Sequence, residues 1–346
     1  MLDAATTRAA EAPRVGPGRD VGRPIRAALL SNPVGGFNKR GDHIDQARRA
    51  AAAFEFPHVE VSDPGDIFRT VRQLDADGVE LLIVNGGDGT VQMALTALFA
   101  EDRTDAPPLL VLLPGGTSNT IPGDVGWKQR PPAGIHALLT AARRGRLEGH
   151  IAPRPVLRVE SPLWERPMCA MQFSAGAIYN AINFYKREIE SRGAHGQTGP
   201  AVTVAWFIVT ILSGRSADIF PEMRLDGTID GRPVRGGPHL GVVASTLDHL
   251  FLGIRPFWGD EPGRLRFTAL GYSPRRLLLA MVPALRGRRG RFVTPENGYT
   301  SYNGDVLDLE IDAGFTLDGE LFDVGAGTHV RITAPAAASF LRMGRG

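Results

Sequence analysis

The stretch NGGDGT at residues 85–90 has the residue types of a phosphate-binding loop. Glycines let the backbone turn sharply and approach a ligand, and the start of a following helix offers N–H groups and a positive dipole end. Asp88 is unusual there, because a carboxylate repels phosphate. It would fit if it binds a metal or takes the proton of a hydroxyl that is being phosphorylated. The alternative interpretation is a tight strand-to-helix turn with an aspartate cap.

A second glycine-rich segment, PGGTSN at residues 114–119, also follows an apolar run. Its Thr117 and Asn119 could bond phosphate or ribose oxygens. Two such loops after neighbouring parallel strands would face one crevice, which is where open α/β sheets bind ligands. A third segment, SNPVGG at residues 31–36, is a weaker signal, because Asn-Pro and Gly-Gly are common in ordinary turns.

A parallel sheet is needed to bring these loops together, and the first half of the chain has the pattern of one. Short apolar runs alternate with segments of helical periodicity, which is typical of a parallel sheet with helices on both faces. The predicted strands are 27–31, 58–62, 80–84 and 109–113, and the predicted helices are 44–54, 67–74 and 91–100. We therefore predict a doubly wound α/β nucleotide-binding domain over residues 25–149, after a disordered tail at 1–24.

The second half of the chain has a different rhythm. Apolar and polar residues alternate at 306–311 and 329–334, and more weakly at 157–160 and 265–268. Alternation indicates strands with one buried face, and hence antiparallel sheets. We predict an antiparallel β-sandwich domain over residues 150–346, interrupted by helical regions at 177–213 and 274–285.

Composition excludes several classes of site. The single cysteine, Cys169, excludes an intrachain disulfide framework and cysteine-cluster metal sites, and its apolar surroundings indicate a buried, inert thiol. Only three lysines occur and none follows a glycine, so a Walker A loop is absent. No apolar run approaches the ~18–20 residues of a spanning helix, and residues 1–20 lack the apolar core of a secretory signal. We expect a cytoplasmic protein.

Taken together, NPxxG at 32–36, GGDGT at 86–90 and PxGTxN at 114–119 resemble the diacylglycerol kinase catalytic family. That family includes sphingosine and ceramide kinases and bacterial lipid kinases. The DGE sequence at 318–320 resembles the family's late DGE motif, and FSAG at 173–176 resembles the segment that opens its second domain. The resemblance covers residues 27 to 335.

The resemblance implies transfer of the γ-phosphate of ATP, with Mg²⁺, to a primary hydroxyl of a lipid such as diacylglycerol, ceramide or a sphingoid base. It implies that ATP lies between the two domains, in contact with loop residues of the first. The residues so assigned to the nucleotide are Asn32, Ser62, Gly86, Gly87, Asp88, Gly89, Thr90, Val91, Gln92, Gly116 and Thr117.

For the general base the resemblance points to Glu320, with Asp318 beside it and Asp88 as the competing candidate. The other interpretation of Asp318-Gly319-Glu320 is a hairpin turn, since Asp-Gly is a strong turn signal. The two interpretations are compatible. The residues that would bind Mg²⁺ stay unassigned.

Two stretches depart from the family pattern. Asn119 is followed by Thr-Ile-Pro-Gly where the family has an aspartate, and the acid comes later, at Asp124. An aspartate-rich stretch that binds a structural Mg²⁺ in many bacterial members is reduced here to Asp260 and Glu261, so we predict no such metal. These departures keep open a catalytically silent lipid-binding protein on the same fold. The GGDG motif, which NAD kinases also carry, keeps open a soluble-acceptor kinase such as NAD kinase.

Net charge is only +2, but Arg264–Phe292 contains eight arginines and no acid. Its middle, Leu277–Leu285, is apolar. An apolar helix flanked by arginines favours peripheral contact with an anionic membrane, here the inner face. The alternative is a core helix with solvated ends, in which Pro283 disturbs the helix. Nucleic acid is not expected as a partner, because aromatic residues are not interleaved with the arginines.

Overall fold

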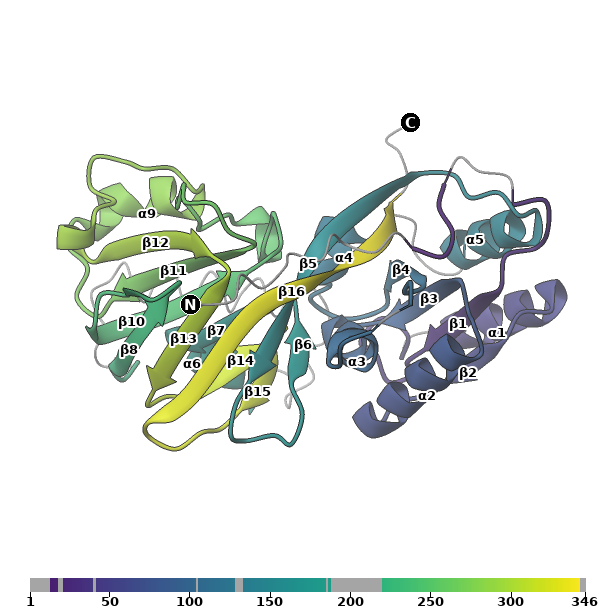
Figure 1. Cartoon of the computed structure of the whole chain (residues 1–346), viewed down its shortest axis with the longest axis horizontal. Coiled ribbons are helices and arrows are strands. Elements are labelled where there is room, and N and C mark those ends of the chain that lie inside the picture. The colour runs from purple at the N-terminus through teal and green to yellow at the C-terminus, as the bar shows by residue number, and fades with distance from the viewer. Residues whose placement is uncertain are drawn as a thin grey trace, which may run out of the picture. The chain divides into compact units, whose positions relative to one another are not determined.

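The computed structural model describes residues 13–17, 21–39, 42–103, 105–127, 133–184, 186–187 and 220–342. The chain forms two compact units, which divide after Arg158 and again before Ala334. The first unit holds the chain up to Arg158 together with its last residues, and the second holds Val159–Thr333 (Figure 1).

The first unit is built on a parallel sheet. Its strands are β1 (Ala27–Ser31), β2 (His58–Glu60), β3 (Leu81–Gly86), β4 (Leu109–Pro114) and the end of β16 (Thr328–Arg342). They lie in the order β16-β4-β3-β1-β2, and each neighbouring pair is parallel. β1 and β3 are buried at every residue. Such strands have no polar face because helices cover the sheet on both sides.

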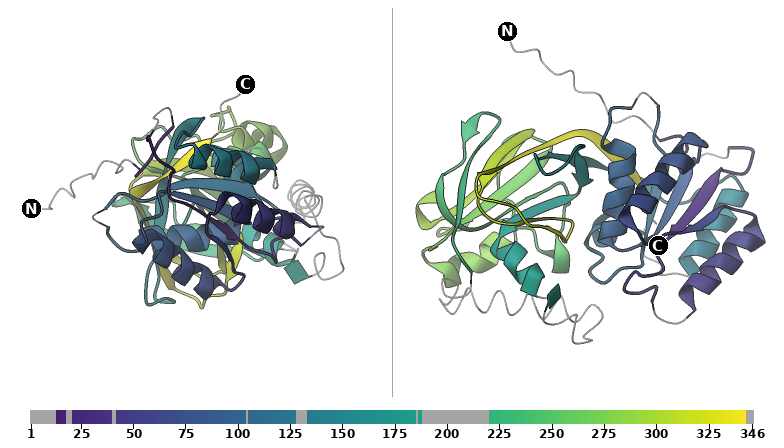
Figure 2. Two further views of the ribbon diagram at one scale, coloured as in Figure 1. Left: turned by 90° about the vertical axis from the view of Figure 1, so that its right-hand side faces the viewer. Right: turned by 90° about the horizontal axis from the view of Figure 1, so that it is seen from below.

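The helices of this unit are α1 (His43–Phe54), α2 (Pro64–Ala76), α3 (Asp88–Phe99), α4 (Thr120–Val125) and α5 (Ala133–Arg143). Residues of α1 and α5 share one apolar core with strand residues such as Leu29, Leu81 and Val111. The next residue along each strand points to the opposite face, because side chains alternate along a strand. Figure 2 shows helices on both sides of this sheet. The predicted doubly wound α/β fold is therefore confirmed.

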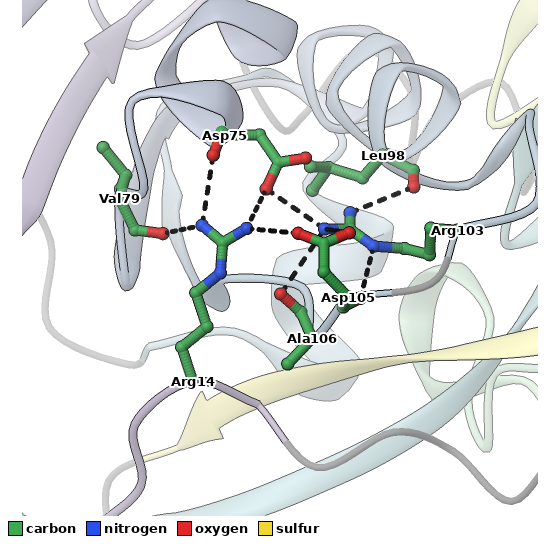
Figure 3. Close-up of polar contacts among 7 residues, drawn as sticks. All are labelled: Arg14, Asp75, Val79, Leu98, Arg103, Asp105 and Ala106. Atoms are coloured by element: carbon green, nitrogen blue, oxygen red, sulfur yellow. Dashed lines mark hydrogen bonds and ion pairs between the residues drawn. The ribbon is translucent and has the colours of Figure 1, made fainter.

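Part of the expected disordered tail packs on the first unit instead. Arg14 donates to the Val79 carbonyl oxygen at 2.7 Å and to the Asp75 and Asp105 carboxylates at 2.9 and 2.8 Å (Figure 3). Arg103 bonds the same two carboxylates, each at 3.2 Å. Two arginines and two aspartates thus compensate one another although up to 91 residues separate them in sequence.

Val15, next to Arg14, is buried in the core of the same unit. The ordered part of the described chain therefore starts before residue 25. A pattern of local periodicity cannot reveal this, because the partners of residues 13–17 lie far along the chain.

The second unit consists mainly of antiparallel strands. They are the end of β5 (His150–Glu160), β6 (Met168–Ala170), β7 (Gln172–Gly176), β8 (Met223–Ile229), β9 (Arg232–Pro233), β10 (Gly237–Ser245), β11 (Leu265–Gly271), β12 (Tyr299–Gly304), β13 (Val306–Ile311), β14 (Phe315–Leu317), β15 (Glu320–Phe322) and the start of β16. β10 pairs antiparallel with β7, β8 and β11, so the sheet forks at this strand. The predicted antiparallel second half is confirmed.

Among the described residues, these strands are accompanied by the helices α6 (Ala177–Phe184) and α9 (Leu277–Leu285) and by the 3₁₀ turns η2 (Phe251–Gly253) and η3 (Pro295–Asn297). Helix α9 begins three residues later than predicted, because Arg276 at its start has left-handed backbone angles. The predicted helical region 177–213 is seen as α6, and its part from 188 onward lies outside the described residues.

The units differ from the expected domains 25–149 and 150–346 at two places. β5 starts in the first unit, so the division falls at Arg158. The last residues return to the first unit, where Leu341 lies in its core. Cys169 is free and buried. Over the described part of the chain, helices that could cross a membrane were not found.

Candidate active site

The strand order of the first unit indicates where on its sheet a ligand would bind. β2 lies on one side of β1, and the strands that follow it in sequence, β3 and β4, lie on the other side. The direction in which strands are added therefore reverses between β1 and β3. In open α/β sheets this reversal point, at the carboxyl ends of the strands, is where ligands bind. The three motif loops follow β1, β3 and β4 and therefore meet at this edge.

Glycine is required in these loops because their backbones touch. A Cβ on Gly116 would lie 2.4 Å from the Cα atom of Gly87, and a Cβ on Gly36 would lie 2.1 Å from Thr117 Oγ1. Both distances are shorter than real Cβ contacts. The glycines of the three motifs thus let the loops pack against one another.

Asparagine side chains hold the loops together beneath this contact. Asn32 Nδ2 donates to Thr90 Oγ1 at 2.9 Å, which joins the loop after β1 to α3. Asn38 Nδ2 donates to the carbonyl oxygens of Asn32, at 2.9 Å, and of Asn85, at 3.1 Å. Asn38 is 4% exposed, and the motifs do not include it. Its only sequence signal is its place just after the first glycine pair.

Asp88 binds the loop that follows β4. Its carboxylate accepts hydrogen bonds from Ser118 Oγ at 2.7 Å and from the backbone N–H groups of Thr120 and Ile121, both at 3.0 Å. It therefore caps the amino end of α4, although it lies in the first turn of α3. Asp88 is therefore a helix cap, as the alternative interpretation has it, but it caps α4 and not α3, the helix that it begins.

Asn119 closes the same loop from the other side. Its backbone is left-handed, with φ of 50°, and its side-chain amide bonds both the N–H and the carbonyl of Gly116, each at 2.8 Å. Asp124, the acid displaced from the family position, is paired with Arg154 at 3.3 Å and is buried. The unusual sequence after Asn119 therefore forms the short helix α4. Asp88 accepts hydrogen bonds from its first N–H groups, and Asp124 within it pairs with Arg154.

The amino end of α3 lacks a side-chain cap. Its N-cap residue is Gly87, which has extended backbone angles and no side chain to accept a hydrogen bond. The helix dipole and the N–H groups of the first turn therefore remain available to an anion. Of the two helices that follow β3 and β4, α4 is capped by Asp88 and α3 has no side-chain cap.

Not all predicted nucleotide residues lie at this edge in the same way. Asn32, Gly86 to Thr90, Gly116 and Thr117 come together in the three loops. Val91 and Gln92 are 1% and 2% exposed within α3, so their side chains face the protein interior. Ser62 is exposed in the segment between β2 and α2.

The DGE motif in the second unit forms a tight hairpin turn. Leu317 of β14 pairs with Glu320 of β15, which leaves Asp318 and Gly319 as a two-residue turn. Both have positive φ, 50° and 88°, as the favoured two-residue hairpin turns require. The Asp318 carboxylate accepts from the backbone N–H groups of Met171, at 3.1 Å, and Gln172, at 2.9 Å. Asp318 therefore attaches the hairpin to the start of β7.

Glu320 differs from both aspartates because its carboxylate is half exposed, at 51%. Its only hydrogen bond within the described residues comes from Lys186 Nζ, at 3.2 Å. The Tyr179 hydroxyl, on α6, donates to the Asp323 carboxylate just after β15. Burial, and next this hydrogen bond, raise the pKa of Tyr179 to about 12. Lys186 and Tyr179 have no motif, although Lys186 is one of only three lysines.

A chain with these loops can be compared with known proteins. Residues 26–148 match the family model of the diacylglycerol kinase catalytic domain. A Pseudomonas fluorescens protein named "Probable lipid kinase YegS-like" is 38% identical over 118 residues, which are 34% of this chain and 38% of that protein. A "Probable lipid kinase YegS" of Salmonella paratyphi A is 27% identical over 223 residues, which are 62% of this chain and 69% of that protein. The match to the Pseudomonas protein thus spans well under half of its length.

A crystal structure described as that of a diacylglycerol kinase from Bacillus anthracis aligns with a TM-score of 0.58. It is 16% identical and the alignment covers 91% of this chain and 96% of that one, so it shows a shared fold. The motif loops, their geometry and the family model agree over the same stretch. Over residues 26–148, the chain is therefore similar to the diacylglycerol kinase catalytic domain.

Proposed function

We propose that this chain is an ATP-dependent kinase that transfers the γ-phosphate to a primary hydroxyl of a lipid. One observation carries the proposal: three glycine-rich loops touch at the carboxyl edge of the sheet, beside a helix start that has no side-chain cap. This arrangement suits a chain of phosphates. The family model that matches residues 26–148, and the relatives that are named as probable lipid kinases, support a kinase with a lipid acceptor.

In this proposal the backbone of residues 86–90 and of Gly116 and Thr117 binds the phosphates of ATP. Phosphoryl transfer depends mainly on positioning and on stabilising charge, and preformed N–H groups supply both. Asp88 acts as a positioning residue, because its carboxylate fixes the loop after β4 against the start of α3.

We propose Glu320 as the general base. The acceptor hydroxyl oxygen forms the new bond to the γ-phosphorus, the bond to the β-phosphate oxygen breaks, ADP leaves, and the hydroxyl proton passes to Glu320. Asp88 and Asp318 suit this role less well, since each accepts hydrogen bonds from backbone N–H groups. Glu320, by contrast, has a half-exposed carboxylate that is bonded to Lys186.

Mg²⁺ fits this scheme as an ion that arrives with the nucleotide. Within the described residues there is no group of three histidine, cysteine or acidic side chains that could hold a metal alone. Magnesium in kinases needs only one or two carboxylates besides the substrate phosphates. When bound, it would neutralise charge on those phosphates, while the loops of this chain hold the nucleotide in place.

The test is phosphate transfer from γ-labelled ATP and Mg²⁺ to diacylglycerol, ceramide, sphingosine and NAD in mixed detergent micelles. Glu320→Gln should lower kcat by at least 100-fold, about the loss expected for a general base. Glu310→Gln is the matched control, an exposed glutamate on β13 of the same unit, and should leave kcat unchanged.

Label on a lipid that disappears in Glu320→Gln supports the proposal and identifies the acceptor. Label on NAD alone would replace the lipid acceptor with a soluble one. ATP binding without transfer to any acceptor of the panel would contradict the kinase activity.

A further inference from the structure

Helix α9 presents an apolar face to solvent. Leu278, Leu279 and Val282 are 71%, 56% and 53% exposed, and they are among the most exposed large apolar side chains of the described chain. At 100° per residue these three positions fall within one 100° sector of the helix. Contiguous exposed apolar residues of this kind usually mark a binding surface.

The opposite face of α9 is firmly packed, so the exposure is not the result of a loose helix. Ala280 and Ala284 are buried against Val293 and Tyr299 of the same unit. Figure 1 shows α9 beside β12, the strand that contains Tyr299. The core-helix interpretation therefore holds for one face only, and the outer face has no partner within the described residues.

Arginines lie at both ends of this apolar face. Arg275 and Arg276 precede the helix, and Arg286, Arg288 and Arg291 follow it. All five are exposed, and within the described residues none of them forms an ion pair with a carboxylate. Arg266 and Arg289, by contrast, are paired with Asp248 and Asp260. The uncompensated positive charge thus lies at the two ends of the apolar face.

We propose that α9 is a membrane-docking helix that lies in the interface of an anionic bilayer. Leu278, Leu279 and Val282 enter the boundary between headgroups and acyl chains, and the flanking arginines bind lipid phosphates. Nine residues span about 14 Å, too short to cross a bilayer, so the helix lies along the surface.

The positive charge of the flanking arginines favours an anionic membrane over a second copy of the chain as the partner of this face. A twofold interface through α9 would bring the same surface from both copies together. Ten unpaired arginines would then face one another, and like charges at close range repel. An anionic lipid surface instead complements them. The docking proposal rests on the proposed function in one respect: a lipid acceptor would explain why the protein binds a membrane.

The experiment is flotation of the full chain with phosphatidylcholine vesicles, with and without 30% phosphatidylglycerol, in the absence of ATP. We expect binding to the anionic vesicles that weakens in 0.5 M NaCl. Leu278→Ser with Leu279→Ser should lower the partition coefficient about tenfold or more, the loss expected for two partly inserted leucines. Arg286→Gln with Arg288→Gln should also weaken binding and reduce its dependence on salt.

Leu163→Ser is the matched control, because Leu163 is a 43% exposed leucine of the same unit outside α9. It should bind vesicles as the unchanged chain does. Equal vesicle binding by the double leucine variant and the unchanged chain would overturn the proposal. So would a dimer, seen by light scattering, that this variant converts to a monomer.

Activity in detergent micelles separates the two proposals. Lost vesicle binding with retained transfer to micellar lipid is expected of the double leucine variant. Vesicle binding without any kinase activity in the unchanged chain would contradict the proposed function and leave the docking helix standing. Kinase activity without vesicle binding would contradict the docking helix and leave the proposed function standing.

Discussion

The Asp88 carboxylate accepts a 2.7 Å hydrogen bond from the Ser118 hydroxyl, which joins two glycine-rich loops that lie 30 residues apart in sequence. The same carboxylate bonds the first N–H groups of α4. An acid in the centre of the proposed phosphate-binding motif thus joins the loops to one another.

Replacing this acid should therefore reduce stability as well as activity. Asp88→Ala leaves the N–H groups of Thr120 and Ile121 without their acceptor, and we expect the free energy of unfolding to fall by about 1–3 kcal/mol. Urea unfolding measures this. Ser118→Ala removes only the hydroxyl bond and should cost about 1 kcal/mol or less. Unchanged stability in Asp88→Ala, with activity abolished, would instead point to a direct role on the substrate.

The contact between Gly87 and Gly116 predicts a sharp difference between two nearby glycines. In Gly116→Ala the new Cβ would overlap the backbone of Gly87, so we expect loss of nucleotide binding, measured by calorimetric titration with ATP. Gly123 lies in α4 with no atom within 4 Å of its Cβ position. Gly123→Ala should keep ATP binding and stabilise the chain by about 0.4–1 kcal/mol. Equal affinity for ATP in both variants would refute the required close approach.

The hairpin turn at Asp318 makes a stability prediction as well. In Asp318→Ala the N–H groups of Met171 and Gln172 lose their acceptor, and alanine must adopt a left-handed backbone. We expect a loss of about 2–3 kcal/mol in thermal or urea unfolding. Asp312→Ala is a suitable comparison, since the exposed Asp312 bonds a single backbone N–H, that of Arg224, and should cost less. A smaller loss for Asp318 than for Asp312 would contradict the positioning role.

His58 predicts how stability depends on pH. Its Nε2 lies 2.9 Å from Ser31 Oγ below the loops, and burial lowers the pKa of His58 below the ordinary value of about 6.5. The unfolded chain therefore binds this proton more readily than the folded one. The free energy of unfolding should hold above about pH 6.5 and fall as pH drops from there toward the lower folded pKa.

Urea unfolding between pH 7.5 and 5 measures this slope, and His58→Gln should reduce it. Burial also lowers the pKa of His239 in the second unit, so the unchanged chain has a second contribution of the same sign. The difference between His58→Gln and the unchanged chain isolates His58. His150→Gln, at an exposed position, serves as the control. An identical slope in His58→Gln would show that burial of His58 has no such effect.

The fold was predictable where local pattern decides it. The apolar runs at 27–31 and 306–311 are strands with the predicted bounds, since one is buried on both faces and the other on one. Helix α4 was not, because Pro122 and Gly123 disfavour a helix locally and the helix exists through the remote carboxylate of Asp88. The same reason hides the packing of Arg14, whose partners lie more than 60 residues away.

For the candidate site, the sequence identified the loops but not the work of each side chain. Asp88 and Asp318 have the residue types of catalysis, and only their hydrogen bonds assign them to capping and to a turn. Asn38 and Lys186 carry no motif, because their importance comes from a neighbour in space. A type of residue at a given spacing therefore predicts that the motif loops meet at one edge of the sheet better than it predicts what each acid does there.

The course of β16 has a consequence for how the chain reaches its fold during synthesis. This strand ends beside β4, where Phe340 pairs with Leu110, and it buries Leu341 in the core of the first unit. The first 158 residues leave the ribosome long before this strand exists. Until the end of β16 has been synthesised, β4 has an open edge on which another nascent strand could pair. The first unit is thus begun before the second unit and completed after it, and a ribosome that stalls near residue 333 would leave the first unit without the end of β16.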